Sequence, residues 1–417
     1  MRIAVVSYSD SRGGAAVVTR RLADALRAAG QDVGMFVFSK ESGSEYVAEI
    51  NGKVRRMGAK ISERAGIFAR NGFSRKNLFK VSTATVGSGL LSIPFVREAD
   101  AVILGWINQG AVSLEEIRSL GRLGKKIVCI MHDMWYFTGI CHHSLGCGKY
   151  KEKCGKCPFL GHFAYTDDLS RKIWRKKEKL YSETPLTFVA VSNWLAERAS
   201  ESSLLRDKRV VVIPNPFPAD RFRTAGNREK LYSLGIDPER KLVLMGAARL
   251  DDPIKDLPTA IAALNRIADA NPDLSEEWQA VFFGGISNPD LFSALRFPHI
   301  RTGAIKDSEE LVNLYACADI VISSSRFETL PGTLIEGQAA GAMPVTFGNG
   351  GQRDIIEHLR TGYIAGEHTP EALAAGIEWA MKAEYDRNML HESVREKFDS
   401  EVVARRIVAL LENRDFV

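Results

Sequence analysis

Short apolar runs alternate with amphipathic helical segments along most of this 417-residue chain. Residues 2–8 form an apolar run typical of a buried strand, residues 15–29 repeat apolar side chains on one helical face, and residues 33–38 return to a strand pattern. A strand, a helix and a second strand in this order imply a parallel sheet with a right-handed crossover. The alternation therefore predicts an α/β fold.

The alternation runs twice, with a break between the two series. Further strands are expected at 101–104, 126–131 and 186–191 in the first series, and at 242–245, 280–283, 318–323 and 344–347 in the second. Residues 210–218 contain three prolines in five positions and predict a stiff, extended connector. Because a chain of this length exceeds one ordinary core, we expect two Rossmann-like domains, 1–210 and 219–395.

Composition narrows the class of protein. Apolar residues make up 45% of the chain and charged residues 26%, as in soluble globular proteins. No apolar run approaches the ~20 residues that span a bilayer, and the first residues enter a strand with no signal-peptide pattern. These features predict a cytoplasmic protein.

Charge is unevenly distributed. Residues 1–190 carry 30 Lys and Arg against 17 Asp and Glu, whereas the remainder carries 26 against 34. A basic first half favours an anionic membrane face or an acidic acceptor. Nucleic acid is not expected, because no helix-turn-helix, zinc-finger or RNP-type pattern accompanies the charge.

The basic residues concentrate in 53–80 and 170–181. In the second segment the side chains of Ile173, Trp174, Leu180 and Tyr181 interleave with cations. Two readings are open for this segment: an interfacial helix lying on lipid headgroups of the inner face of the plasma membrane, or an ordinary helix with a small buried stripe.

Two glutamates follow the apolar run 318–323. Glu328 precedes a turn with Pro331 and Gly332, and Glu336 lies in the helical segment 333–341. Ligands bind at the carboxyl ends of strands in open α/β sheets, and the first turn of a helix offers free backbone N–H groups to an anion. The segment therefore predicts a site for a phosphate-bearing ligand.

Two cations follow an earlier strand. Arg249 and Lys255 lie six residues apart, between the strand 242–245 and a helix expected at 257–270. Paired cations in this position suit a ligand that carries negative charge, such as a phosphate.

Three features of the first half are candidates for ligand contacts. Gly13 and Gly14 follow the first strand, although their spacing is not that of the dinucleotide fingerprint, and they could equally form a simple tight turn. His132 ends the strand 126–131, where it could hydrogen-bond a sugar hydroxyl. Its neighbour Asp133 could be the acceptor's base or only a loop cap.

Four cysteines fall within seventeen residues: Cys141, Cys147, Cys154 and Cys157. The last two form a C-x2-C pair, which in a reducing compartment is typical of a structural zinc site. His142 or His143 could replace a cysteine as a ligand, and disulfides or free thiols are the rival readings. Cys129 and Cys317 lie in apolar runs and are expected to be packing residues.

The E-x7-E pattern of Glu328 and Glu336, together with Arg249 and Lys255, resembles that of retaining GT-B glycosyltransferases of family 4. This resemblance implies two Rossmann-like domains that face a central cleft, with a C-terminal helix within 396–417 crossing back to the first domain. The His-Asp-x-Trp stretch from His132 and the cysteine-rich insert at about 139–160 are similar to members that act in bacterial exopolysaccharide or colanic-acid-type assembly.

The resemblance also implies roles for individual residues. Arg249 and Lys255 would hold the donor diphosphate, Glu336 the ribose and Glu328 the sugar. Sugar and phosphate would also contact the loop Thr329, Leu330, Pro331 and Gly332, the glycines Gly13 and Gly14, and the active-site histidine His132. The expected reaction moves a sugar from a nucleotide-diphosphate sugar to a glycan or lipid-linked acceptor, with retention of configuration.

No catalytic metal is expected, because Asp251 and Asp252 lack the spacing of an Asp-x-Asp metal site and the cations can supply its charge. Two other functions are open: a non-catalytic nucleotide-sugar-binding protein, and an NAD-linked or epimerase-type enzyme. The presence of all four charged side chains of the donor motifs argues against the first, and the missing dinucleotide fingerprint argues against the second.

Overall fold

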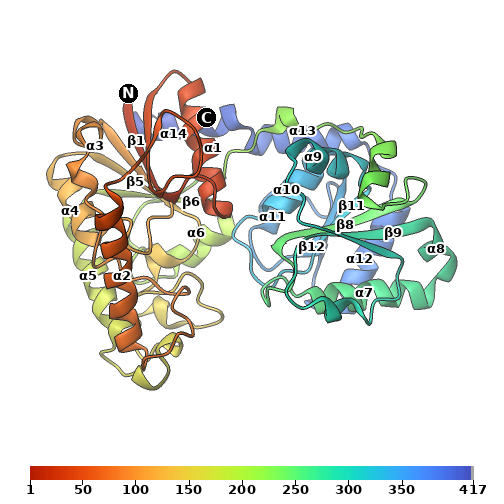
Figure 1. Cartoon of the computed structure of the whole chain (residues 1–417), viewed down its shortest axis with the longest axis horizontal. Coiled ribbons are helices and arrows are strands. Elements are labelled where there is room, and N and C mark those ends of the chain that lie inside the picture. The colour runs from red at the N-terminus through yellow and green to blue at the C-terminus, as the bar shows by residue number, and fades with distance from the viewer. Residues whose placement is uncertain (415–417) are drawn as a thin grey trace. The chain divides into compact units, whose positions relative to one another are not determined.

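The computed structural model describes residues 1–414 and divides into two compact units. The first comprises Met1–Phe217 together with the chain from Ser400 onward, and the second comprises Pro218–Asp399. The last three residues of the expected C-terminal segment lie outside the described part. Figure 1 shows both units with their elements labelled, and each is described by itself.

The first unit is built on a seven-stranded parallel sheet in the order β3-β2-β1-β4-β5-β6-β7. Its strands are β1 (Arg2–Ser9), β2 (Asp32–Ser39), β3 (Val47–Glu49), β4 (Ala101–Leu104), β5 (Lys126–Met131), β6 (Leu186–Ala190) and β7 (Val210–Val212). Its helices are α1 (Gly14–Ala28), α2 (Lys53–Arg70), α3 (Pro94–Glu98), α4 (Leu114–Arg122), α5 (Leu169–Glu183), α6 (Asn193–Ser200) and α14 (Ser400–Leu411).

The second unit has a six-stranded parallel sheet in the order β10-β9-β8-β11-β12-β13. Its strands are β8 (Lys241–Arg249), β9 (Trp278–Gly285), β10 (His299–Gly303), β11 (Ile320–Ser323), β12 (Met343–Phe347) and β13 (Tyr363–Ala365). Its helices are α7 (Leu257–Ala270), α8 (Pro272–Glu277), α9 (Ser308–Cys317), α10 (Gly332–Ala339), α11 (Gln352–Ile355), α12 (Pro370–Lys382) and α13 (Arg387–Phe398).

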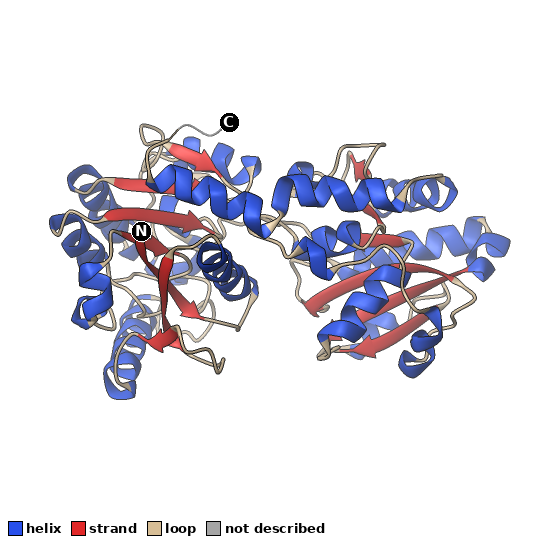
Figure 2. Cartoon of the chain, turned by 90° about the horizontal axis from the view of Figure 1, so that it is seen from above, coloured by secondary structure: helices blue, strands red, loops and turns tan. Residues whose placement is uncertain are grey.

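Helices cover both faces of each sheet, as the alternation of blue helices and red strands in Figure 2 shows. In the second unit α9 and α10 lie on one face, and α7 and α12 pack together on the other. Parallel strands that are covered on both faces are apolar throughout, and β4, β11 and β12 are buried along their whole length. The prediction of an α/β fold with two parallel-sheet domains is confirmed.

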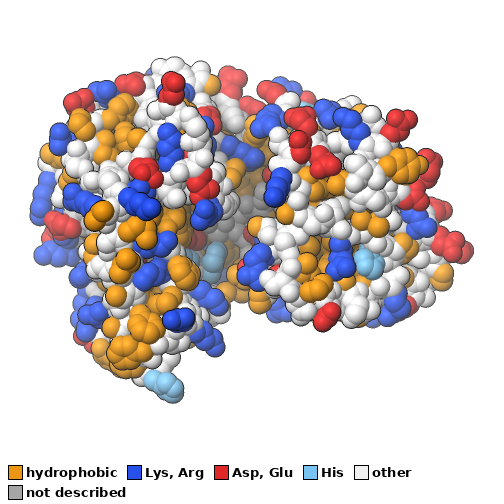
Figure 3. Space-filling model, in the orientation of Figure 1, with side chains coloured by type: hydrophobic (Ala, Val, Ile, Leu, Met, Phe, Trp, Pro, Cys, Tyr) orange, Lys and Arg blue, Asp and Glu red, His pale blue; other side chains and the backbone are white. Residues whose placement is uncertain are grey.

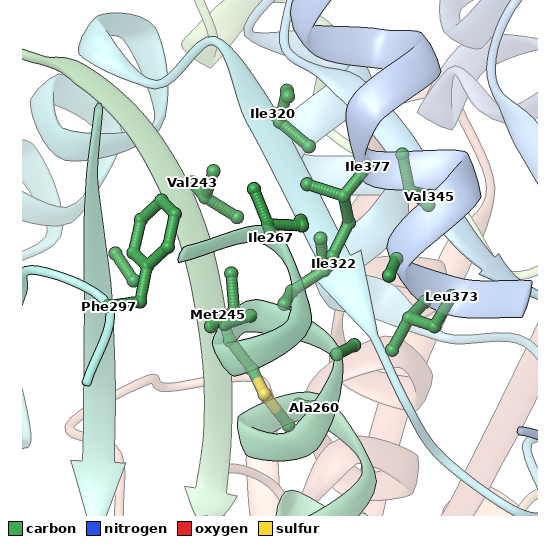
Figure 4. Packing of buried hydrophobic residues seen from close by; sticks show 14 of the residues in the cluster. Val243, Met245, Ala260, Ile267, Phe297, Ile320, Ile322, Val345, Leu373 and Ile377 are labelled. Atoms are coloured by element: carbon green, nitrogen blue, oxygen red, sulfur yellow. The ribbon is translucent and has the colours of Figure 1, made fainter. Parts of the chain in front are cut away.

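Figure 4 shows the core of the second unit, where α7 and α12 meet the sheet. Ile267 and Ile377 come from these helices and pack against Val243, Ile320 and Val345 from three neighbouring strands; all five are almost completely buried. This continuous apolar layer supports the central strands, so the residues that follow them start from a rigid base.

Local sequence signals set several helix ends. Ser113 caps α4 with a full capping box, in which Glu116 returns a hydrogen bond to the Ser113 backbone. Asp168 caps α5 by accepting from the backbone N–H groups of Ser170 and Arg171. These caps satisfy N–H groups that a helix leaves without internal partners.

The end of the first unit differs in detail from the expected connector. Val210–Val212 forms the edge strand β7, which pairs with β6, so only the proline-rich residues after it have no strand partner. Helix α14 packs on α1 in the same unit. Lys126 Nζ also donates to the carbonyl oxygen of Leu411 over 2.7 Å.

Candidate functional site

The two central strands of the second unit, β8 and β11, are neighbours, but the chain leaves them toward opposite edges of the sheet. From β8 the chain proceeds outward to β9 and β10 on one side, and from β11 to β12 and β13 on the other, while β8 and β11 are hydrogen-bonded neighbours. Such a point, where the strand order reverses, leaves a crevice at the carboxyl ends of the two strands. The predicted ligand residues of both motifs follow these two strands.

Lys255 and Glu328 meet at this point. The Lys255 ammonium forms an ion pair with the Glu328 carboxylate, and the two side chains are 30% and 17% exposed. The loops that carry them are also joined through the backbone: Arg326 N–H donates to the Ile254 carbonyl over 2.8 Å, and Ser324 Oγ donates to the Lys255 carbonyl over 2.8 Å. Two segments that are 73 residues apart thus present one cation and one carboxylate side by side.

Arg249 is the last residue of β8 rather than part of the following loop. Its guanidinium lies 3.4 Å from the carboxylate of Asp251, which also accepts from the backbone N–H groups of Ser287 and Asn288. The Arg249 side chain is 63% exposed, so it is oriented by Asp251 and still accessible to an anion.

Helix α10 begins at Gly332, and Pro331 at its N-cap position provides no side-chain cap. The first N–H groups of the helix are therefore open to an anionic ligand. Leu330, expected to touch substrate, is only 8% exposed and belongs mainly to the packing of this turn. Thr329 is partly exposed in the same loop.

Helix α10 starts at Gly332, one residue before the expected 333, so Glu336 is its fifth residue. Its carboxylate accepts a hydrogen bond of 2.9 Å from the hydroxyl of Tyr315, a fully buried residue of α9. Burial raises the pKa of Tyr315 well above its usual value, and the Glu336 charge adds to the rise. Tyr315 thus remains a hydrogen-bond donor and fixes the direction of Glu336.

Asp256 is a residue that the sequence analysis missed. It adopts a left-handed conformation (φ 49°) at the start of α7, is 6% exposed, and accepts from Arg326 and from His368, each over 2.8 Å. His368 in turn stacks on Phe347 at the end of β12. This network ties together the segments that follow β8, β11 and β13 and reaches the end of β12. The adjacent Lys255 is the only local signal of the position of Asp256.

In the first unit, Gly13 and Gly14 follow β1. Gly13 has φ +91°, a conformation that L side chains rarely adopt, and a Cβ at either glycine would meet no atom within 4 Å. The backbone N–H groups of Ser11 and Arg12 both donate hydrogen bonds to Ser9 Oγ. The loop is therefore a tight turn that also leaves open space beside both glycines, so the two readings of the sequence are compatible.

His132 lies at the carboxyl end of β5, partly exposed, with Nε2 3.2 Å from Thr19 Oγ1 of α1. It borders a small cavity together with Thr19 and Pro214. Burial of the ring lowers its pKa from the usual 6.5. The imidazole is thus neutral near pH 7 and suited to hydrogen bonding rather than to holding an anion.

Asp133 is fully engaged within the first unit. One carboxylate oxygen accepts from Trp135 N–H, and the other accepts from Trp106 Nε1 and lies 2.8 Å from His142 Nδ1. Burial alone would raise the pKa of Asp133, but the neighbouring His142 holds it at about 2. His142 Nε2 is 3.1 Å from Ser82 Oγ. The geometry favours the loop-cap reading of Asp133, and both ring nitrogens of His142 have hydrogen-bond partners.

The four clustered cysteines line one cavity of about 20 Å³, room for about one water molecule. All six cysteines are free thiols. Within residues 1–414, no group of His, Cys, Asp and Glu side chains is already drawn together as metal ligands. Burial raises the pKa of Cys154 to about 11 and that of Cys157 to about 12, so neither is a reactive thiolate by itself. Cys129 and Cys317 are packing residues, as expected.

Helix α5 resolves the two readings of the second basic segment. Ile173, Trp174, Leu180 and Tyr181 are each at most 5% exposed. They form the buried stripe of an ordinary helix, so the interfacial reading of this segment is wrong. None of the described helices combines the length and hydrophobicity needed to cross a membrane.

Comparison with known proteins adds family matches, two relatives and one solved structure. Residues 12–221 match the family described as Glycosyltransferase Family 4, and residues 228–397 match the family described as Glycosyl transferases group 1. An uncharacterized glycosyltransferase of Methanocaldococcus jannaschii is 26% identical over 316 residues, which cover 70% of this chain and 77% of that protein. A D-inositol 3-phosphate glycosyltransferase of Jonesia denitrificans is 25% identical over 39% of each chain. The HepE protein of Anabaena, solved in complex with UDP and glucose, matches 99% of both chains with a TM-score of 0.62 and 15% identity.

Proposed function

The chain belongs to glycosyltransferase family 4 and has the GT-B fold; on that premise we propose that it transfers a sugar from a nucleotide-diphosphate sugar to a glycan or lipid-linked acceptor. The observation that carries the proposal is the pairing of Lys255 with Glu328 where the strand order of the second unit reverses. A diphosphate and a sugar hydroxyl are the two chemical groups that this pair suits. The complex of HepE with UDP and glucose is consistent with a donor of this class.

The second unit supplies the donor contacts. Arg249 and Lys255 hold the diphosphate, and the open N–H groups of α10 add neutral donors to the phosphate oxygens. Glu336, directed by Tyr315, binds the ribose hydroxyls. When the diphosphate binds Lys255, the ion pair between Lys255 and Glu328 breaks. The Glu328 carboxylate can then accept a hydrogen bond from a sugar hydroxyl.

The chemical step replaces one C–O bond at the anomeric carbon by another. The bond to the leaving diphosphate breaks, and the acceptor oxygen bonds on the same face, so the configuration is retained. The acceptor's proton passes to a phosphate oxygen of the departing diphosphate. Lys255 and Arg249 stabilise the negative charge that develops on the leaving group. This route needs no catalytic metal, because the two cations neutralise the phosphates.

In this proposal the first unit contacts the donor sugar as well as the acceptor. His132, neutral near pH 7, accepts or donates one hydrogen bond to a hydroxyl. Gly13 and Gly14 leave room for a ligand to approach the backbone. The cysteine-rich insert, similar to that of members in bacterial surface-polysaccharide assembly, supports an acceptor of that pathway class.

Helix α2 supports contact with the inner face of an anionic plasma membrane. It turns Arg56 and Glu63 inward and exposes Val54, Met57 and Ile61, which are 88%, 40% and 62% exposed. Figure 3 shows hydrophobic side chains interspersed with Lys and Arg over this part of the first unit. An exposed apolar stripe among cations is the pattern of an interfacial helix.

Replacement of Lys255 by alanine tests the donor site. The Lys255→Ala variant is expected to release nucleoside diphosphate about 100-fold to 1,000-fold more slowly than the wild type, because one charge-stabilising group is lost. Rates are measured with candidate UDP- and GDP-sugars and glycan or lipid-linked acceptors. Lys382→Ala, an exposed lysine at the end of α12, is the matched control and should keep the wild-type rate.

Near-normal turnover of Lys255→Ala would refute the diphosphate role. If the wild type binds a nucleotide sugar but releases no nucleoside diphosphate with any acceptor, the protein is a non-catalytic binder instead. Retention is tested separately by NMR, through the anomeric coupling constant of the first-formed product; an inverted product would refute the same-face step.

A further inference from the structure

The four cysteines that line the cavity of the first unit come from two short segments. Cys141 follows the 3-10 turn after β5, and Cys147 lies six residues on; Cys154 and Cys157 form the C-x2-C turn. That turn bends sharply, because Cys154, Gly155 and Lys156 all have positive φ values (50°, 108° and 46°). The two cysteines of this motif thereby reach the same cavity from a single turn.

A backbone N–H group already points at sulfur in this turn. The N–H of Gly139 donates to Cys154 Sγ over 3.2 Å. Such an N–H···S bond favours negative charge on sulfur. Cys154 therefore occupies surroundings that favour a thiolate once a cation is present to bind it.

A buried lysine lies close in the fold to the same cluster, since Thr138, which accepts from it, precedes Gly139, which donates to Cys154. Lys177 of α5 is completely buried, and its ammonium donates to the carbonyl oxygens of Trp135 and Thr138 and lies 3.6 Å from the centre of the Trp135 ring. Cys141, Cys154 and Asp133 are the groups whose negative charge would act on it. Because burying an ammonium without a counter-charge is costly, negative charge on the sulfurs would stabilise the charged form of Lys177.

We infer that Cys141, Cys147, Cys154 and Cys157 bind one structural zinc ion as thiolates, with Lys177 as the buried counter-cation. Four thiols lose four protons on binding Zn²⁺, so the site carries a net charge of −2, which the Lys177 ammonium partly neutralises. Among the described residues the four thiols share one cavity without forming a ready-made ligand group. Binding therefore requires their side chains to rotate toward a common point in that cavity.

The zinc ion would hold the loop that carries Cys141, and this loop is hydrogen-bonded to other buried groups. His142, next to Cys141, contacts Asp133 and Ser82, and Asp133 follows His132 at the end of β5. A site closed around Cys141 thus fixes the orientation of this strand end. The inference does not depend on the proposed transfer reaction.

The metal content of the purified full-length protein tests the inference. Elemental analysis is expected to find one zinc per chain, and replacement of zinc by Co²⁺ should give the sulfur-to-cobalt charge-transfer and visible bands of a tetrahedral thiolate site. Cys147→Ser and Cys157→Ser should lose the metal or bind it far more weakly. Cys317→Ala, which removes a buried thiol of the second unit, is the matched control and should retain one zinc.

Lys177→Met tests the counter-cation separately. Loss of a supporting group around a metal site typically lowers affinity about 10-fold to 100-fold, and competition with a chelator should show a decrease of this size. A merely structural role for Lys177 would instead lower the unfolding temperature of the metal-free and zinc-bound forms equally.

Two outcomes would overturn the zinc site. One is a wild-type chain that stays metal-free after addition of Zn²⁺ or Co²⁺ while all six thiols react with a thiol reagent. The other is a pair of disulfides among the four cysteines, detected by mass spectrometry of the unreduced protein. If the serine variants do not fold, zinc removal from the wild type with a chelator, followed by stoichiometric rebinding, still decides the question.

Discussion

Lys255 and Glu328 form an ion pair of partly exposed side chains. Pairs of this kind contribute about 0–1 kcal/mol to stability, because solvent screens them and both side chains lose freedom. The pair therefore has little weight in holding the fold together. The ion pair instead keeps a cation and a carboxylate at one place until a ligand competes for them. Lys255→Ala should therefore lower activity with little change in the stability of the fold.

Tyr315 allows a second test at the scale of single residues. Its hydroxyl directs Glu336, and hydrogen bonds to charged groups contribute about 1.5–3 kcal/mol. Tyr315→Phe is expected to weaken donor binding about tenfold, with a smaller change in the maximal rate, because the ribose contact is made in the ground state as well as in the transition state. Titration calorimetry with the nucleotide sugar measures the change.

The matched control is Tyr232→Phe, which alters an exposed tyrosine of the same unit. Unchanged donor affinity in Tyr315→Phe, with the fold intact by circular dichroism, would show that Glu336 does not bind the donor or needs no orientation from Tyr315.

Among the elements, α2 and α5 show how two basic helices acquire different roles. Helix α5 buries its apolar stripe under the sheet, whereas α2 buries Arg56 and Glu63 and exposes apolar side chains. Arg56 finds partners in the Phe38 carbonyl and Glu49, and Glu63 accepts from Thr83 N–H. These partners allow Arg56 and Glu63 to be buried beside Ala59 and Ile67, while Val54, Met57 and Ile61 stay exposed.

The membrane role of α2 can be tested with vesicles. Ile61 and Phe79 are 62% and 64% exposed, and both line a groove that also contains Lys60, Arg64 and Arg75. Burying one such side chain contributes about 1.5–3 kcal/mol, so the double variant Ile61→Ser and Phe79→Ser should bind vesicles of phosphatidylglycerol and phosphatidylethanolamine at least about tenfold more weakly in co-sedimentation.

Leu123→Ser, at an exposed leucine after α4, is the control and should not change vesicle binding. Binding to pure phosphatidylcholine should be weak for all variants, since the cations then have no anionic partner. Equal binding of the wild type and the double variant to anionic vesicles would exclude α2 as the contact.

For the whole molecule, donor binding should appear as stabilisation of the folded chain. A ligand that binds only the native state, at 100 times its dissociation constant, adds about 2.7 kcal/mol to the free energy of unfolding. In a domain of this size that corresponds to a rise of roughly 5–10 °C in the unfolding temperature. A panel of nucleotide sugars, read by thermal unfolding, identifies the base and sugar of the donor.

The same panel with Lys255→Ala provides the control, because its shift should be much smaller with the nucleotide sugar that stabilises the wild type most. Free sugars should give no shift with either protein. A panel in which no nucleotide sugar stabilises the wild type would contradict the donor assignment.

The sequence by itself determined the fold class and selected candidate ligand residues. Buried parallel strands are apolar along their length, so runs such as 101–104 and 126–131 could be located to the residue. Short edge strands such as β3 and β13 were not predicted. Each has three residues that pair with one neighbouring strand, and such a strand needs no long apolar run. Lys255 and Glu328 could be selected as candidates because each lies in the loop after a predictable strand.

Only the tertiary structure decided which of these residues meet and which faces are buried. The Lys255 and Glu328 contact, the support of Glu336 by Tyr315 and the network of Asp256 join segments far apart in the chain, and no local pattern encodes such distances. The same holds for α5 and α2, whose similar mixtures of cations and apolar residues have opposite outcomes. Burial depends on what the rest of the fold places against a helix, and that information is absent from the helix itself.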